Sequence, residues 1–172
     1  METVTGAIGV GGIVGSLLVT ICKPPKSYVK TIFISAALAY LLCDLLLGIG
    51  KIPLVWIFAA FAGNLPIPFL NASENYLLMS KIPHDIQGRV FSIRGAIQFI
   101  TMPAGYLVGG LLADKVFEPL MAYSQMAQRL FGGIVGVGKG SGMALIFIIT
   151  GLLGFSFSVI SYGNKHIRRL DD

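Results

Sequence analysis

The chain has 172 residues, of which 55% are hydrophobic and only 12% are charged, and its net charge is +5. Soluble domains are about 25% charged, so this composition excludes an ordinary water-soluble fold. The mean hydropathy of +0.80 agrees with that conclusion. The basic residues gather in alternate connecting segments, which is typical of membrane topology. We therefore expect a lipid bilayer as partner and no nucleic acid.

Five apolar runs predict an all-α fold, a multi-pass transmembrane helical bundle that forms a single membrane domain over residues 1–172. A helix needs about 20 mainly apolar residues to cross the hydrocarbon core. The expected spans lie at approximately 6–22, 31–49, 53–78, 91–113 and 141–162. An extracytoplasmic segment is expected at 114–140, including a short surface helix near 123–131, and a cytoplasmic tail at 163–172.

The first run is unusually rich in glycine. Gly11 and Gly15 form a pair of small residues four positions apart, and Gly12 and Ser16 form a second pair. This spacing lets another helix approach closely, because association in lipid depends on direct contact and not on water exclusion. A moving helix contact and static packing explain the pattern equally well.

Two prolines, Pro66 and Pro68, interrupt the run at 53–78. Each lacks a backbone N–H, so the sequence predicts a bent or broken helix at this point. Asn64 and Asn71 stand on either side of the prolines. Interrupted membrane helices with polar neighbours are typical of substrate sites, since freed backbone carbonyls can face a cavity.

Polar side chains inside membrane segments are costly and therefore indicate function. Asn64, Asn71 and Asn75 recur close to one helical face, with Glu74 beside them. We expect Asn64, Asn71 and Glu74 to face a central substrate pathway. For Glu74, a position at the cytoplasmic interface is an equally good explanation. Gln98, on the next run, either reaches the same pathway or bonds to a neighbouring helix for packing.

Asp44, the one acidic residue of the second run, lies near the outer end of that run. It is a candidate for a proton route or for an ion pair with Lys51. A purely structural acid at the membrane interface is the alternative.

The charged strip from Lys81 to Arg94 separates two long apolar runs and predicts a loop at a membrane face. The positive-inside rule assigns the more basic connections to the cytoplasm. That side of the membrane holds nine of the 13 Lys and Arg residues, namely Lys23, Lys26, Lys30, Lys81, Arg89, Arg94, Lys165, Arg168 and Arg169. The other four are Lys51, Lys115, Arg129 and Lys139. This count predicts an outer N-terminus and a cytoplasmic C-terminus.

Several alternative chemistries lack the residues they need. Residues 133–140 resemble a phosphate-binding loop, but Gly140 stands where Ser or Thr is required. His84 and His166 are isolated, and Cys22 and Cys43 lie in apolar surroundings, so neither a metal nor a disulfide is expected. No nucleophile and base are paired. We therefore expect no enzyme activity and no cofactor.

Three segments carry a resemblance to a known family. These are QGRVFSIR at 87–94, PAGYLVGGLLAD at 103–114 and GVGKGSGMALIFIITGLLG at 136–154, within a likeness that covers nearly the whole chain. Together with the basic KPPK at 23–26, their order is similar to the C-terminal half of major facilitator superfamily permeases, in the macrolide-efflux-like branch.

The resemblance implies a partial major facilitator fold, equivalent to helices eight to twelve of a twelve-helix secondary active transporter in the cell membrane. Such a protein exports drugs or other amphipathic small molecules by alternating access. The implied partners are a small-molecule substrate and a missing N-terminal half, helices one to seven. The alternative is a truncated, non-transporting membrane protein that packs with a separate N-terminal half.

The resemblance also implies a cytoplasmic gating loop that contains Asp85, Arg89 and Arg94. A simple topological role, in which the arginines hold a helix end in the cytoplasm, explains these charges as well.

Overall fold

The computed structural model describes residues 2–136, 138, 140–164 and 167, and these contain helices and no strand. Within the described residues, five helical stretches are long and apolar enough to cross a membrane. Their bounds are Glu2–Ile21, Tyr28–Ile49, Pro53–Lys81, His84–Tyr123 and Ser141–Gly163. The predicted all-α class and the number of candidate spans are confirmed.

The helices group into two compact units. One unit contains the chain up to Leu77 together with the chain from Ala144 onward, and the other runs from Leu78 to Met143. Each unit is described below by itself.

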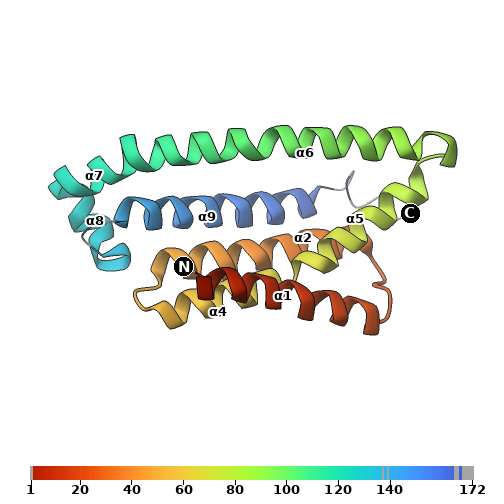
Figure 1. The fold of residues 1–172 in the computed structure, drawn as a ribbon, viewed down its shortest axis with the longest axis horizontal. Helices are drawn as coiled ribbons and strands as arrows, with labels where there is room; N and C mark the ends of the chain where they lie inside the picture. The colour runs from red at the N-terminus through yellow and green to blue at the C-terminus, as the bar shows by residue number, and fades with distance from the viewer. Residues whose placement is uncertain (1, 137, 139, 165–166, 168–172) are drawn as a thin grey trace. The chain divides into compact units, whose positions relative to one another are not determined.

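The first unit contains α1 and four helical segments that follow it, together with most of α5 and α9 (Figure 1). The bounds are α1 Glu2–Ile21, α2 Tyr28–Ala39, the π-helix η1 Tyr40–Leu45, α3 Leu46–Ile49, α4 Pro53–Asn64, α5 Ile67–Lys81 and α9 Ser141–Gly163. Ser27 begins α2, because its Oγ accepts a hydrogen bond from the Lys30 N–H at 3.1 Å. Pro53 lies in the first turn of α4, where its missing N–H costs nothing.

Glycines bring α1 into backbone contact with α4 and the start of α5, alongside it in Figure 1. A Cβ atom on Gly11 would lie 2.5 Å from the carbonyl oxygen of Phe61, and one on Gly15 would lie 2.5 Å from that of Leu65. Both contacts advance along the two helices in the same direction, so α1 and α4 are parallel. The close helix contact expected from the glycine spacing is present.

The last span packs against the second in the same manner but in the opposite direction. A Cβ atom on Gly151 would lie 3.0 Å from the Cβ of Asp44, and one on Gly154 would lie 2.6 Å from the Tyr40 ring. The opposite side of η1 faces α4. There a Cβ atom on Gly63 would lie 2.5 Å from the Cβ of Cys43. The π-helix η1 is thus held between two helices that each present a glycine to it.

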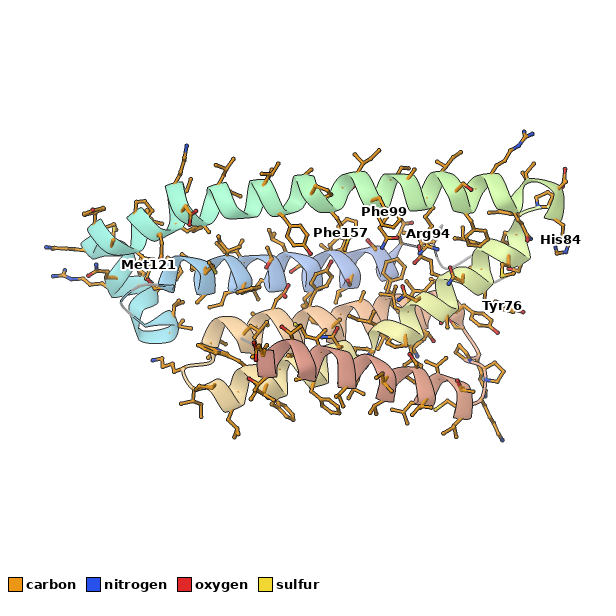
Figure 2. All side chains as sticks on the ribbon, in the orientation of Figure 1. Tyr76, His84, Arg94, Phe99, Met121 and Phe157 are labelled. Carbon is orange, nitrogen blue, oxygen red and sulfur yellow. The ribbon has the colours of Figure 1, made fainter. Side chains whose placement is uncertain are left out.

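The second unit contains α6 His84–Leu112, the π-helix η2 Ala113–Phe117, α7 Glu118–Tyr123 and α8 Gln125–Val135 (Figure 1). The first three form one continuous helical stretch of 40 residues. A side-chain hydrogen bond joins α8 to α7. Gln128 Nε2 of α8 donates to the backbone oxygen of Met121 of α7, labelled in Figure 2, at 2.9 Å. The expected short helix therefore exists as α8, and its place on the membrane surface stays a prediction.

The Glu118 carboxylate anchors the segment that leads into α9. It accepts hydrogen bonds from the backbone N–H of Gly140 and, at 2.9 Å, from that of Gly142. A Cβ atom on Gly142 would lie 2.5 Å from the Glu118 nitrogen, so the two backbones touch here. An acidic side chain at the start of a helix is favourable because the first N–H groups there carry partial positive charge.

The predicted loop from Lys81 to Arg94 is wrong in its extent. Only Ile82 and Pro83 separate α5 from α6, and α6 begins at His84. The side chain of Gln87 closes this short connection, since its Nε2 donates to the carbonyl oxygens of Met79 and Ile82, each at 2.9 Å. The prediction of a loop rested on the charged residues alone, and exposed turns of a helix carry charged residues equally well.

Part of the predicted 114–140 segment is also helical, because η2 and α7 continue α6 as far as Tyr123.

Five basic or titratable residues used in the topology count and the metal argument lie outside the described residues, namely Lys139, Lys165, His166, Arg168 and Arg169.

Candidate functional site

A groove of about 430 Å³ lies where α1 passes the break between α4 and α5. It contains one of the predicted site residues, Asn64, which is the last residue of α4. One face of α1 and the beginning of α5 complete it, with the lining residues Gly12, Ile13, Ser16, Leu17, Thr20, Asn64, Ile67 and Pro68.

The two prolines cause the break beside the groove. Pro66 has no N–H for the carbonyl of Ala62, and Pro68 has none for the carbonyl of Asn64. The helical ladder therefore stops at Asn64, and α5 starts at Ile67. The Leu70 N–H bonds to the Pro66 carbonyl at 3.2 Å and restarts the ladder. The Asn64 carbonyl is left at the groove without its usual helical donor.

The polar side chains of the groove donate hydrogen bonds to backbone carbonyls of their own helices. Ser16 Oγ donates to the Gly12 carbonyl at 2.8 Å, and Thr20 Oγ1 donates to the Ser16 carbonyl at 3.0 Å. Asn64 Nδ2 donates to the Ala60 carbonyl at 2.7 Å. Because each hydroxyl has a single hydrogen, its oxygen remains as an acceptor, as does Asn64 Oδ1.

The groove is therefore amphipathic. Ile13, Leu17 and Ile67 supply apolar walls, while hydroxyl and amide oxygens supply hydrogen-bond acceptors. None of its lining residues is ionisable, so no general base among them is available to activate the Ser16 or Thr20 hydroxyl. This arrangement is suited to binding an apolar molecule that carries a hydrogen-bond donor.

The remaining predicted pathway residues do not line this groove. Asn71 is exposed and Glu74 is half-buried, both on α5, beyond the break that separates their helical face from that of Asn64. Gln98 is exposed on α6 and belongs to the other unit. That Asn71, Glu74 and Gln98 face a substrate pathway stays a prediction.

Asp44 lies half-buried in the π-helix η1. Asp44 lies against α9, because a Cβ atom on Gly151 would lie 3.0 Å from the Asp44 Cβ. Sequence reasoning did not identify α9 as its neighbour, because Gly151 is more than 100 positions away. π-Helical turns often occur at functional sites, so Asp44 is a second polar position within this unit.

The three residues of the predicted gating loop lie on the first turns of α6. Asp85 and Arg89 are exposed and four residues apart, which places them on one helical face. Arg94 is half-buried and follows Arg89 by five residues, about 140° around the helix. The three charges therefore do not form one surface on this helix.

No group of three or more His, Cys, Asp or Glu residues gathers in the described part of the chain. Cys22 is exposed, Cys43 is half-buried, and both are free thiols.

The described residues thus form a helical protein with five helical stretches able to cross a membrane and a groove beside one of them. The chain is similar to macrolide efflux protein A of Streptococcus pyogenes and to the protein of the same name from S. pyogenes serotype M6, strain ATCC BAA-946 / MGAS10394. Identity is 27% over 110 residues in both cases, which is 62% of this chain and 26% of each relative.

The match thus spans about a quarter of the length of these curated relatives. No protein-family profile and no solved structure matches the chain. The similarity supports a distant relationship to a drug-efflux protein.

Proposed function

We propose that the chain is part of a secondary active transporter of the major facilitator type that exports drugs or other amphipathic small molecules. Two observations support this. The chain is similar to a macrolide efflux protein, and it contains five helices that can cross a membrane. The absence of ionisable residues from the groove lining favours a transporter over an enzyme.

The groove at Asn64 is the observation that carries the proposal. Its volume of about 430 Å³ lies within the range of about 300–1,000 Å³ that is usual for small-molecule sites. We propose that it forms one wall of the transport pathway. Further helices, equivalent to helices one to seven of a facilitator permease, would supply the other wall, and the two halves would rock around the site.

The experiment measures macrolide accumulation in a drug-sensitive bacterial host. The chain is expressed alone and together with the first seven helices of a macrolide efflux protein, and its amount in the membrane is measured by immunoblot. We expect accumulation to fall when both parts are present. Asn64→Ala removes an acceptor from the groove, and a lost hydrogen bond corresponds to about a 2- to 10-fold weaker apparent affinity.

Asn71→Ala is the matched control, because Asn71 is exposed and outside the groove. Equal loss of efflux in both variants would show that the groove has no particular role. Unchanged accumulation with both parts present in the membrane would contradict the transporter proposal itself.

The orientation we propose has the C-terminus in the cytoplasm of a cell-membrane protein. In a variant with Cys22 and Cys43 replaced by serine, Arg89→Cys and Lys51→Cys are labelled with a membrane-impermeant maleimide in intact cells. We expect labelling at position 51 only. Labelling at position 89 as well, or instead, would contradict the assigned topology.

A further inference from the structure

A second cavity, of about 400 Å³, lies within the first unit and shares no lining residue with the Asn64 groove. Its walls are the end of α1, the connection at residues 22–27, the start of α2 and one side of α5. Because α1 ends at Ile21 and α2 begins at Tyr28, the cavity lies at the ends of two candidate spans. Span ends are where the hydrocarbon of a bilayer meets its headgroups.

One wall of this cavity is aromatic. The rings of Tyr28 and Tyr76 are stacked with their centroids 4.1 Å apart and their planes 19° from parallel. Figure 2 labels Tyr76 on α5, close to the connection between α1 and α2. Tyrosine is enriched at membrane interfaces because its ring suits the lipid and its hydroxyl suits the headgroup layer.

The remaining lining combines apolar surface with positive charge. Val19 and Phe69 extend the apolar wall toward the spans, and Lys23 lines the cavity at the end of α1. Lys26 and Lys30 are exposed on the same connection and in the first turn of α2. The N-terminus of α2 adds the partial positive charge of a helix end.

This combination selects an amphipathic anion. A phosphate group can pair with Lys23 while the attached acyl chain lies along Val19 and Phe69, and the tyrosine pair contacts the glycerol region between them. A free phosphate ion would use the charge but leave the apolar wall against water. We infer that this cavity holds an anionic phospholipid of the surrounding bilayer, of the phosphatidylglycerol class.

The inference does not depend on the proposed transport activity, since the lipid is a component of the membrane and not the cargo. A chain that transports nothing would still bind the lipid, and a working exporter could lack this site. The two proposals therefore fail separately.

The test uses the whole chain, purified in detergent and analysed by native mass spectrometry with added phosphatidylglycerol or phosphatidylcholine. We expect preferential retention of phosphatidylglycerol. Lys23→Gln removes the cation in the cavity and is expected to weaken this binding about fivefold, the contribution of one basic residue at an anionic interface. Tyr76→Leu keeps apolar bulk but removes the stacked ring and hydroxyl, and is expected to weaken binding of both lipids.

Lys51→Gln is the matched control, because Lys51 lies on a different connection, outside the cavity. Lys23→Arg, which preserves the charge, is expected to restore phosphatidylglycerol binding. Circular dichroism of each variant verifies that the helices are intact.

Three results would overturn the inference. The first is equal retention of the two lipids by the unmodified chain. The second is an equal loss of phosphatidylglycerol in Lys51→Gln and Lys23→Gln. The third is displacement of the lipid by glycerol 3-phosphate at equal concentration, which would assign the site to a soluble phosphate.

Discussion

The glycines at the helix contacts of the first unit differ from those of α6 in the second unit. In the first unit, six glycines lie so close to a neighbouring segment that an added Cβ atom would come within 3.0 Å of one of its atoms. They are Gly11, Gly15, Gly48, Gly63, Gly151 and Gly154. In the second unit, the glycines of α6 meet nothing within 4 Å, at positions Gly88, Gly95, Gly105, Gly109 and Gly110. Both sets occur in apolar helices with similar small-residue spacing.

The difference shows that glycine spacing alone does not specify a helix contact. Each glycine inside a helix costs about 1 kcal/mol relative to alanine. In the first unit this cost is offset, because the missing side chain lets backbones approach and increases dispersion contacts. The glycines of α6 make no such contact within the second unit, so nothing there offsets their cost. The sign of a glycine-to-alanine substitution is therefore expected to depend on whether the glycine lies against a neighbouring element.

The largest effect is expected for Gly63→Ala. The added methyl group would lie 2.5 Å from the Cβ of Cys43 and 2.9 Å from its nitrogen, so α4 and η1 must separate. Overpacking of this kind costs about 1–3 kcal/mol. We expect a lower midpoint of thermal unfolding in detergent, followed by circular dichroism. An unchanged midpoint would remove the basis of the comparison, because Gly63 would then tolerate a side chain.

An intermediate effect is expected for Glu118→Gln in the second unit. The carboxylate accepts two backbone hydrogen bonds at the start of α9, whereas the amide offers one oxygen and one nitrogen that cannot accept. Loss of a helix-capping interaction costs about 1 kcal/mol. We expect faster hydrogen–deuterium exchange at Gly140 and Gly142 with little change in α1.

Asp114→Asn is the control for that experiment, because it removes an acidic charge one helical turn away without altering the two bonds to Glu118. If both variants accelerate exchange equally, the effect is one of general charge and not of the carboxylate contacts.

The smallest effect, and one of opposite sign, is expected for Gly105→Ala. Its methyl group meets no atom within 4 Å, and alanine favours the helix. We expect the unfolding midpoint to stay the same or to rise slightly, by at most about 1 kcal/mol in stability. A destabilisation as large as that of Gly63→Ala would show that α6 is packed closely along this face, and the contrast between the units would be lost.

Local features could be predicted from the sequence because their causes are local. Pro66 and Pro68 lack N–H groups, so a break between α4 and α5 was expected and is present. The spacing of Gly11 and Gly15 indicated a close helix contact, and they touch Phe61 and Leu65. The loop at Lys81–Arg94 was wrong because charge marks solvent exposure in helices and loops alike.

Only part of the groove lining was predicted, because the rest of it belongs to α1, which is distant from Asn64 in the chain. Asn64 was identified from its place beside the prolines, and it lines the groove. Asn71, which the periodicity of the sequence grouped with Asn64, does not line this groove, and its place in a pathway stays a prediction. Ser16 and Thr20 of α1 were not singled out, because nothing near them in the chain indicates that they approach Asn64.

The sequence by itself determined that this chain is a set of helices able to cross a membrane, since apolar length and missing N–H groups act within one turn of the backbone. The tertiary structure decided which glycines carry a contact, that Asp44 lies against α9, and that Asn64 and α1 line one groove. Those outcomes depend on which helix lies opposite, and a partner many residues away leaves no mark on the local sequence.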